Sequence, residues 1–148
     1  MSKVIIGCDH AAYDLKEKIK THLTGKGFRV SDMGCDGPDS VDYPDYAEKV
    51  GKAVVSDAEA LGILICGTGI GISIAANKIH GVRAALVHTE FEARMSRNHN
   101  NANVLCMGAR VLDHDLAVSL VDVWLSESFE GGRHGRRVDK IMALENNP

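Results

Sequence analysis

Short apolar runs alternate along this chain with segments whose apolar residues recur at helical spacing. Residues 4–6, 61–66, 82–87 and 104–107 are each too short for a helix and, apart from Arg83, uncharged and largely apolar at successive positions, as strands buried on both faces are. A weaker run over 28–33 predicts a further strand, at an edge of the sheet. We therefore expect five strands, four of them buried.

Three segments between these runs carry the spacing of an amphipathic helix. Their apolar positions are Leu15, Ile19 and Leu23; Tyr46, Val50 and Val54; and Leu116, Leu120, Val121, Trp124 and Leu125. Gly25 and Gly27 end the first helix, and Pro44 suits the first turn of the second. Because strand and helix alternate, the pattern predicts an α/β fold with a parallel sheet covered by helices on both faces.

Composition limits the class of protein. The chain has 148 residues, 45% of them hydrophobic, which suits a single domain over 1–148. Its net charge of −3 disfavours a nucleic-acid binder that works by bulk positive charge. The cysteines, Cys8, Cys35, Cys66 and Cys106, lie far apart and without a C-x-x-C pair, which disfavours a zinc module or a disulfide scaffold and indicates a reducing compartment.

One uncharged stretch, over 60–77, is long enough to be taken for a membrane span. Gly62, Gly67, Gly69 and Gly71 interrupt it, however, so we expect a strand, a glycine loop and a helix instead. No membrane partner is predicted.

The glycine loop, residues 66–71 (Cys-Gly-Thr-Gly-Ile-Gly), follows a predicted strand and opens a helix expected to continue to Lys78. Its backbone N–H groups can converge on an anion. Ile72 stands where a dinucleotide fingerprint needs its third glycine, although Glu90 is an acid at suitable spacing. A tight strand-to-helix connection without any ligand is an equal alternative.

Cys66 heads this loop, where nearby amides favour a thiolate that can act as base or nucleophile. The alternative to a reactive Cys66 is a small, inert core residue, which is the role that we expect of Cys106.

His99 falls near the end of a predicted helix that starts at about Glu90, where the helix dipole favours the protonated form of the histidine. Arg133 and Arg137 share a helix face if Gly135 does not break it, and then can clamp a phosphate or form a solvated basic face.

Five motifs are distributed along nearly the whole chain. They are 7–10 (Gly-Cys-Asp-His), 42–44 (Asp-Tyr-Pro), 66–78, 96–100 (Ser-Arg-Asn-His-Asn) and 130–134 (Glu-Gly-Gly-Arg-His). Together they resemble the ribose-5-phosphate isomerase B family. The base in that family is a cysteine heading the glycine loop or a glutamate six residues later. Here these positions hold Cys66 and Ile72, so the chain is similar to the cysteine type.

The resemblance implies a cytoplasmic aldose–ketose isomerase that needs no metal or cofactor. It would interconvert ribose 5-phosphate and ribulose 5-phosphate through an enediolate, in the non-oxidative pentose phosphate pathway. The implied fold is a three-layer α/β/α sandwich with a Rossmann-like five-stranded parallel sheet. The implied assembly is a homodimer or dimer of dimers with shared active sites, and residues 131–148 would pack at the dimer interface.

The resemblance also implies a role for each site residue. Cys66 would move the proton between C2 and C1. The Thr68 hydroxyl and the backbone of the loop would stabilise the enediolate, through Gly67, Thr68, Gly69, Ile70 and Gly71. His99 would open the sugar ring with help from Asp9, and Asn100 and Tyr43 would line the sugar site. The phosphate would be bound by His10, Arg110, Arg133 and Arg137. The resemblance supports His134 and Arg136 less strongly as phosphate ligands.

Other functions stay open at this point. Isomerases of allose 6-phosphate or galactose 6-phosphate share the same scaffold and chemistry. A nicotinamide-dependent oxidoreductase would use the glycine loop and Glu90, and a sugar-phosphate sensor would bind without turnover.

Overall fold

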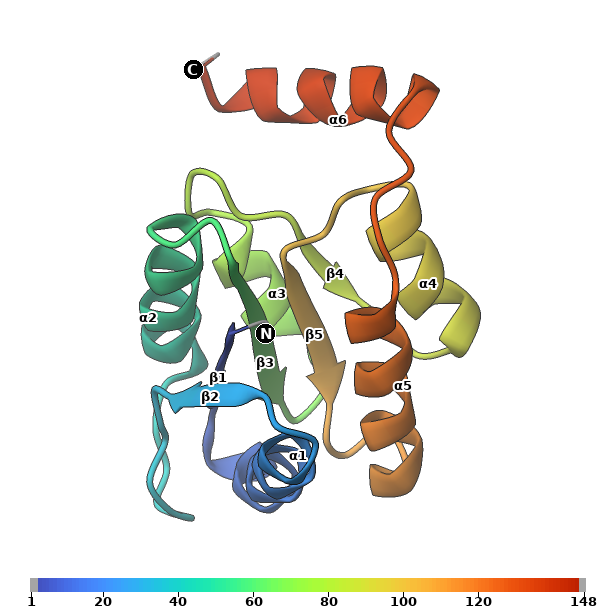
Figure 1. The fold of residues 1–148 in the computed structure, drawn as a ribbon. Coiled ribbons are helices and arrows are strands. Elements are labelled where there is room, and N and C mark those ends of the chain that lie inside the picture. The colour runs from blue at the N-terminus through green and yellow to red at the C-terminus, as the bar shows by residue number, and fades with distance from the viewer. Residues whose placement is uncertain (1–2, 147–148) are drawn as a thin grey trace.

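The fold is described by a computed structural model for residues 3–146 (Figure 1). Its strands are β1 (Lys3–Cys8), β2 (Arg29–Asp32), β3 (Ala60–Cys66), β4 (Ala84–Leu86) and β5 (Val104–Gly108). Its α-helices are α1 (Tyr13–Gly25), α2 (Tyr43–Val55), α3 (Ile70–Ala76), α4 (Glu90–Asn98), α5 (His114–Ser126) and α6 (Arg133–Ala143). Short 3-10 helices precede α1 and follow α6; they are η1 (His10–Ala12) and η2 (Leu144–Asn146). The expected domain 1–148 includes residues 1–2 and 147–148, which lie outside the described residues.

All five strands are parallel and form one sheet in the order β2-β1-β3-β5-β4. The prediction of a five-stranded parallel sheet with an edge strand over 28–33 is therefore confirmed. The chain leaves β1 toward β2 on one side and later enters β3 on the other, so the strand order reverses between β1 and β3. In open α/β sheets, ligands bind beyond the carboxyl ends of the strands at this point.

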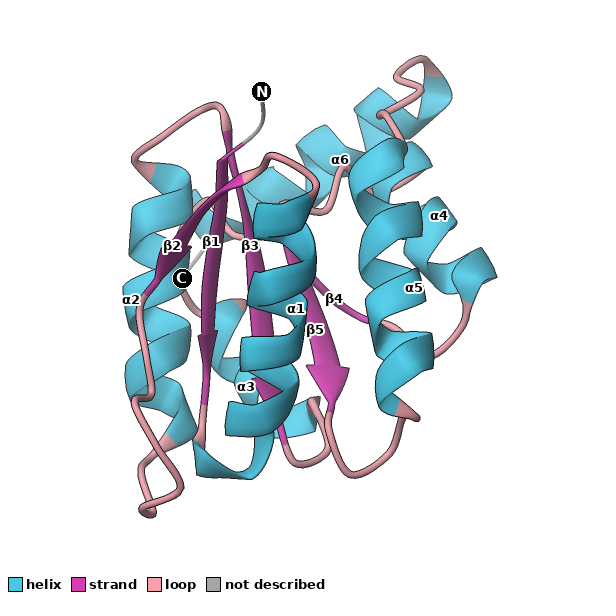
Figure 2. Cartoon of the chain, turned by 60° about the horizontal axis from the view of Figure 1, so that its bottom comes forward, coloured by secondary structure: helices cyan, strands magenta, loops and turns pink. Residues whose placement is uncertain are grey.

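Helices cover both faces because side chains of the inner strands alternate between two cores. One set packs with α1, α4 and α5, and comprises Val4, Ile6, Ile63, Ile65, Leu105 and Met107. The intervening set packs with α2 and α3, and comprises Ile5, Leu64, Cys66, Val104 and Cys106. Figure 2 shows α1 in front of the strands. The three-layer α/β/α arrangement is thus confirmed.

The ends of the first two helices also follow the prediction. α1 ends at Gly25, and Gly27 just beyond it has φ +90°, a conformation that glycine adopts without strain. Pro44 lies in the first turn of α2, where its missing N–H costs no hydrogen bond.

β4 is shorter and less buried than the apolar run over 82–87 predicts. Its three residues are half-buried, and it lies at an edge of the sheet beside β5. The expectation of a strand buried on both faces was wrong here, because an edge strand has only one neighbouring strand to cover it.

Two helices also differ in detail from the prediction. α3 ends at Ala76 and does not reach Lys78, because Asn77 is held by β4. Its side-chain amide donates to the Ala84 carbonyl at 3.0 Å and accepts from the Ala84 N–H at 2.8 Å. In α5, Leu116 is exposed, so the buried stripe is narrower than the apolar pattern indicated.

α6 lies outside the three layers, beyond the amino ends of the strands (Figure 1). Its last turns are tied to the segment before β4. Arg83 donates to the Met142 sulfur at 3.5 Å, and the Gly81 N–H donates to the Glu145 carboxylate at 2.7 Å. Ile141 and Leu144 remain exposed, at 45% and 67%.

The uncharged stretch over 60–77 forms β3, a loop and α3. Across residues 3–146, no helix combines the length and apolar character that a membrane crossing requires.

Candidate active site

The glycine loop joins β3 to α3 at the carboxyl end of the central strand. Gly69 precedes α3 at φ +79°, in the left-handed region that favours glycine. A Cβ atom at this position would lie 2.6 Å from Leu86 Cδ1 and 2.7 Å from the carbonyl carbon of Met107. Both the backbone conformation and the close approach of β5 therefore require a glycine here.

Cys66 is the last residue of β3, and its side chain is only 4% exposed. The Gly69 N–H donates to Cys66 Sγ at 3.2 Å, so a backbone hydrogen bond of the loop holds the sulfur in place. Ile72, at the position of the alternative glutamate base, is fully buried in the core between sheet and α3. The loop thus offers Cys66 as its candidate base.

Thr68 is exposed at the mouth of the loop. Its hydroxyl accepts a hydrogen bond from the Ile70 N–H at 3.2 Å. The N–H groups of Gly69 and Ile70 are thus already bonded within the loop. Within residues 3–146, the N–H groups of Gly67 and Thr68 have no protein hydrogen-bond partner, so they are available to a substrate oxygen.

The end of β1 lies beside the glycine loop. The Asp9 N–H donates to the Ile65 carbonyl at 3.2 Å, one residue before Cys66. The Asp9 side chain is 6% exposed and accepts from the Ala11 N–H at 3.1 Å, which fixes the carboxylate at the start of η1.

His10 follows, and its Nδ1 accepts from the Val41 N–H at 3.1 Å. An acceptor Nδ1 leaves the proton of the neutral ring on Nε2. This contact therefore sets the tautomer of His10 and orients its ring.

Tyr43 and Arg110 complete this side of the site. Gly71 gives the tyrosine room, since a Cβ on Gly71 would lie 2.7 Å from the Tyr43 hydroxyl oxygen. The Arg110 guanidinium lies 3.5 Å from a Cβ position on Gly67, and the Arg110 N–H donates to the Gly67 carbonyl at 3.0 Å. Both side chains are exposed beside the loop.

The structure thus brings together most of the predicted residues, which we call the carboxyl-end group. Its members are Asp9, His10, Tyr43, Cys66, Gly67, Thr68, Gly69, Ile70, Gly71 and Arg110.

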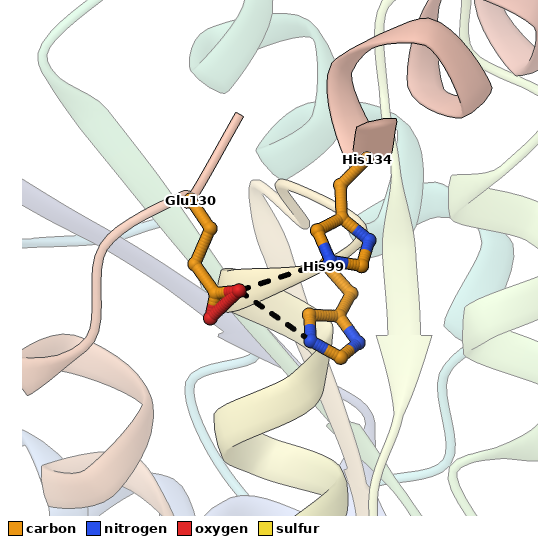
Figure 3. Close-up of side chains that lie close together, drawn as sticks. All are labelled: His99, Glu130 and His134. Carbon is orange, nitrogen blue, oxygen red and sulfur yellow. Dashed lines mark ion pairs between the residues drawn. The ribbon is translucent and has the colours of Figure 1, made fainter. Parts of the chain in front are cut away.

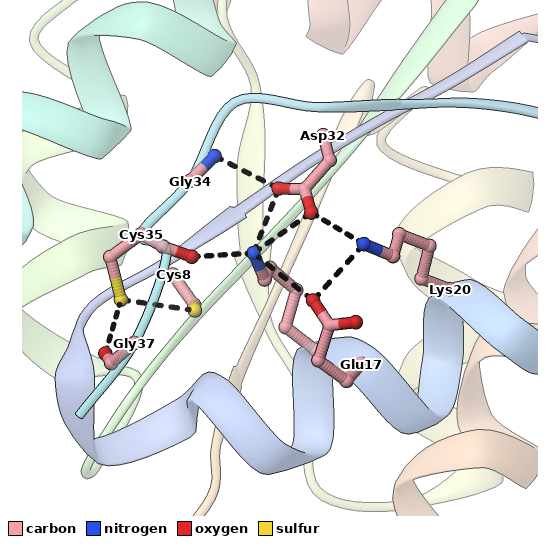
Figure 4. A network of polar contacts seen from close by, with 8 residues as sticks. Cys8, Glu17, Lys20, Asp32, Gly34, Cys35 and Gly37 are labelled. Carbon is pink, nitrogen blue, oxygen red and sulfur yellow. Dashed lines mark hydrogen bonds and ion pairs between the residues drawn. The ribbon is translucent and has the colours of Figure 1, made fainter.

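A buried ion pair anchors the segment that leads from β2 to Val41 (Figure 4). The ammonium group of Lys16, whose side chain is 1% exposed, donates to both carboxylate oxygens of Asp32 at 2.8 and 2.9 Å and to the Cys35 carbonyl at 2.6 Å. Burial by itself raises the pKa of Asp32, but hydrogen bonds from Lys16, Lys20 and the Gly34 N–H outweigh it and lower that pKa. The network holds the chain that positions His10.

The remaining predicted residues lie elsewhere, on α4 and α6. His99 caps the end of α4, as expected, and its ring stacks on His134 with centroids 3.9 Å apart (Figure 3). Glu130 Oε1 lies 3.7 Å from Nε2 of each histidine. Asn100 follows His99 and is exposed.

Arg133 and Arg137 lie on one face of α6, because the helix continues through Gly135. Both are exposed, and neither forms an ion pair with a carboxylate within residues 3–146. We call His99, Asn100, Glu130, Arg133, His134 and Arg137 the amino-end group.

The two groups lie at opposite ends of the sheet. Cys66 ends β3, whereas the loop after His99 leads to Asn103, whose carbonyl accepts from Gly62 near the start of β3. A strand of seven residues spans about 20 Å. One chain therefore does not unite the predicted phosphate ligands His10 and Arg110 with Arg133 and Arg137.

Comparison with known proteins decides the family. Residues 4–141 match a family model described as Ribose/Galactose Isomerase. The chain belongs to the ribose/galactose isomerase family. Ribose-5-phosphate isomerase B of Escherichia coli is 48% identical over 145 residues, which are 98% of this chain and 97% of that protein.

Solved structures agree with this membership of the ribose/galactose isomerase family. Ribose-5-phosphate isomerase B of Clostridium thermocellum matches with a TM-score of 0.95 and 52% identity, over 97% of each chain. The enzyme of Mycoplasma genitalium, solved with bound ribulose-5-phosphate, has a TM-score of 0.95 and 45% identity over 99% of this chain and 97% of that one. The resemblance seen in the motifs is confirmed.

The other cysteines of this isomerase-family chain are poor candidates for chemistry. Burial, together with the neighbouring Cys35, raises the pKa of Cys8 to about 12. Burial also raises the pKa of Cys106, which is fully enclosed, as expected of a core residue. Cys8 and Cys35 lie side by side, with 3.9 Å between their sulfur atoms.

Sequence reasoning missed two features of this isomerase-family site. Glu130 was noticed only as part of a motif, yet it contacts both histidines. Its separation of four residues from His134 was the available signal. The pairing of Lys16 with Asp32 carried no signal, because the two residues meet only through the packing of α1 against β2.

Proposed function

We propose that this chain is an aldose–ketose isomerase that interconverts D-ribose 5-phosphate and D-ribulose 5-phosphate through an enediolate. The observation that carries the proposal is Cys66, held by the Gly69 N–H at the head of the loop, in a fold that matches a relative containing ribulose-5-phosphate. We assign the reaction to the non-oxidative pentose phosphate pathway. We place it in the cytoplasm, a compartment in which four free thiols are stable.

Cys66 acts as the base in this proposal. Its thiolate removes the proton from C2 of the open-chain aldose, and the electrons of that C–H bond form the C1–C2 double bond while the aldehyde oxygen becomes negatively charged. Cys66 then returns the proton to C1, while the C2 hydroxyl passes its own proton to the negatively charged oxygen on C1, so that C2 becomes the ketone carbon and C1 carries the hydroxyl.

The glycine loop stabilises the enediolate oxygen. The N–H groups of Gly67 and Thr68 supply the donors, because those of Gly69 and Ile70 are bonded inside the loop. A single donor of this kind is typically worth about 3 kcal/mol in the transition state. The Thr68 hydroxyl adds a further donor.

Ribose 5-phosphate is mainly a closed furanose, so a ring-opening step precedes proton abstraction. His99 donates a proton to the ring oxygen, while the Asp9 carboxylate assists at the anomeric hydroxyl. Asn100 and Tyr43 line the sugar. Since His99 and Asp9 belong to opposite ends of one chain, this step requires two copies.

The phosphate is bound in the same shared way. His10 and Arg110 come from one copy, and Arg133 and Arg137 come from the other. The two arginines of α6 suit this role because they share a helix face and have no carboxylate partner within the described chain.

Exposed apolar side chains support the assembly of two copies. Ile70 and Ile74 of α3, beside the glycine loop, are 54% and 57% exposed, and Ile141 and Leu144 extend the exposed apolar surface of α6. A two-fold axis that places α6 of each copy over the α3 side of the other covers both surfaces and completes two sites. The segment 131–148 is therefore the proposed interface, in a dimer or a dimer of dimers.

The activity is tested by a coupled assay of ribose 5-phosphate conversion, run with a chelator. Parallel assays with allose 6-phosphate and galactose 6-phosphate identify the preferred substrate, since the hexoses place one more carbon between the reacting centre and the phosphate. A thermal shift with NAD or NADP but not with ribose 5-phosphate would instead indicate an oxidoreductase. Binding without turnover would indicate a sensor.

Shared sites are tested by mixing two inactive variants, Cys66→Ala and His99→Ala, after reversible dissociation. In a mixed dimer, one site carries both substitutions and the other carries neither. Random pairing then restores about a quarter of the wild-type activity. No recovery, in mixtures shown to contain mixed dimers, contradicts the sharing of sites but leaves the isomerase activity itself untouched.

The thiolate is tested by iodoacetamide labelling near neutral pH. Cys35 is the matched control, because its side chain is 2% exposed and that of Cys66 is 4% exposed. Since the thiolate is the reactive form, we expect Cys66 to react faster. Equal rates contradict a thiolate at Cys66.

A further inference from the structure

Three side chains that commonly bind metal ions meet in the amino-end group. Nε2 of His99 and Nε2 of His134 each lie 3.7 Å from Glu130 Oε1, and one ligand atom from each residue lies within 4.8 Å of the others (Figure 3). Two imidazoles and one carboxylate form a recurrent ligand set of zinc sites that keep a fourth position open.

Two of the three separations between ligand atoms are close to those around a bound ion. With metal–ligand bonds of about 2.0–2.1 Å, neighbouring ligands of a tetrahedral ion lie about 3.4 Å apart. The two contacts of Glu130 exceed this value by only a few tenths of an ångström. The carboxylate already lies beside the stacked rings, on the side of their Nε2 atoms.

The backbone holds the three residues together from separate elements. His99 caps α4, His134 lies in the first turn of α6, and Glu130 lies between α5 and α6. The Glu130 N–H donates to the Asn98 carbonyl at 3.0 Å, which fixes the carboxylate beside the end of α4. The ligand set therefore does not depend on a long flexible loop.

We propose that His99, Glu130 and His134 bind one divalent transition-metal ion, Zn²⁺ above all, and that the bound ion inhibits the isomerase. The binding stands on the contacts of these residues alone, whereas the inhibition rests on the proposed function. Imidazole ligands select zinc, copper and nickel over the oxygen-seeking Mg²⁺ and Ca²⁺.

The site has two features that oppose a metal ion. The histidine rings are stacked with 9° between their planes, so both must turn about the Cβ–Cγ bond for their lone pairs to converge. Arg133 and Arg137 add positive charge to the same turn of α6. These features make the affinity moderate, which suits an inhibitory site that releases its ion to a chelator.

Inhibition follows from the identity of one ligand. A metal ion on Nε2 of His99 occupies the atom that would carry the proton for ring opening, and Glu130 and His134 are drawn toward the ion with it. The ion thus blocks the conversion of the closed aldose while Cys66 remains free.

Binding is tested on the purified full-length protein without substrate. Zn²⁺ is titrated in competition with a chromogenic zinc indicator, and Co²⁺ is used as a spectroscopic probe of the ligands. We expect one ion per chain, with a visible Co²⁺ spectrum of nitrogen and oxygen ligands. Glu130→Gln and His134→Ala should each lower the Zn²⁺ affinity at least about tenfold.

His88→Ala is the matched control variant. His88 Nδ1 lies 3.5 Å from Glu92 Oε1, so this surface pair offers one imidazole and one carboxylate but lacks the second imidazole. Its removal should leave the affinity unchanged. The proposal is overturned if His88→Ala lowers the affinity as much as His134→Ala does, or if a sulfur-to-cobalt band that disappears in Cys66→Ser places the ion on the thiol.

Inhibition is measured separately, as turnover of ribose 5-phosphate with and without Zn²⁺ and after addition of chelator. Wild-type turnover should fall with the occupancy of the site and return with the chelator, and Glu130→Gln should need about tenfold more Zn²⁺. Binding without any loss of turnover overturns the inhibitory part. Absence of isomerase activity in the chelated protein refutes the proposed function and not the metal site.

Discussion

The two ends of the sheet are built in different ways. The carboxyl-end group rests on the ends of β1, β3 and β5, where backbone hydrogen bonds and a glycine in the left-handed region leave little freedom. The amino-end group rests on the end of α4 and on α6, a helix outside the three layers with an exposed apolar surface. In the proposed mechanism, the groups that must approach a reacting carbon closely lie at the ends of the strands, and those contributed to the site of a second copy lie at the end of α4 and on α6.

The largest expected effect comes from Cys66→Ala, which removes the proposed base from the carboxyl-end group. We expect turnover to fall at least about 10³-fold, while the binding of ribose 5-phosphate changes little because the phosphate ligands remain. Turnover is measured by the coupled assay, and binding by isothermal titration calorimetry.

Cys106→Ala is its control, because Cys106 is a buried thiol on the same face of the sheet. It should reduce stability by about 1 kcal/mol and leave turnover intact. Near wild-type turnover in Cys66→Ala would exclude Cys66 as the base.

Gly69→Ala tests how tightly the backbone of the carboxyl-end group is packed. The new Cβ would lie within 3 Å of Leu86 and of the Met107 backbone, at a φ of +79°. We expect a loss of about 3 kcal/mol in the free energy of unfolding, together with impaired turnover. Urea denaturation measures the first quantity.

Gly25→Ala is the matched substitution, since a Cβ at Gly25 meets no atom within 4 Å and the residue ends α1. It should raise stability slightly, by about 0.5 kcal/mol. Equal losses in both variants would show that the glycine loop is not closely packed against β5.

His99→Ala tests the amino-end group. Turnover of ribose 5-phosphate should fall about 10²-fold, because the closed ring must open without a proton donor. Exchange of deuterium from solvent into ribulose 5-phosphate needs only Cys66 and should stay within several-fold of wild type. Nuclear magnetic resonance follows this exchange.

Turnover and deuterium exchange together distinguish the roles of the residues at the two ends of the sheet. Loss of exchange equal to the loss of turnover in His99→Ala argues against a ring-opening role. Cys66→Ala serves as the reference, because it should lose both.

The smallest expected effect concerns the pH dependence of stability. Burial, with His99, Arg133 and Arg137 nearby, lowers the pKa of His134 below its usual value near 6.5, although Glu130 opposes the shift. As pH falls below 6.5, the unfolded chain takes up a proton that the folded chain does not. Stability contributed by neutral His134 is therefore complete above pH 6.5 and is lost as pH falls toward the lowered pKa.

Thermal unfolding between pH 7.5 and pH 5 measures this contribution. His134→Gln should show a shallower decline than wild type, whereas His80→Gln, at an exposed histidine, should follow wild type. An identical decline in His134→Gln and wild type would remove His134 as a source of the pH dependence.

Much of the fold was predictable because strands and helices leave local patterns. The alternation of apolar residues located β1, β3 and β5, and Gly25 and Pro44 marked helix ends. The burial of β4 was not predictable, since a short apolar run looks the same in the middle of a sheet and at its edge. The strands and helices that pack against a strand, and not its own residue types, decide how deeply it is buried.

The sequence by itself determined which reactive side chains each half of the proposed site contains. Cys66 lies at a strand end because its strand and loop are adjacent in the chain, and Arg133 and Arg137 share a face because helical geometry is local. Only the tertiary structure decided that these halves lie about 20 Å apart. It also decided that Glu130 lies 3.7 Å from Nε2 of each of two histidines, because the direction of α4 and the position of α6 depend on contacts between residues distant in the sequence.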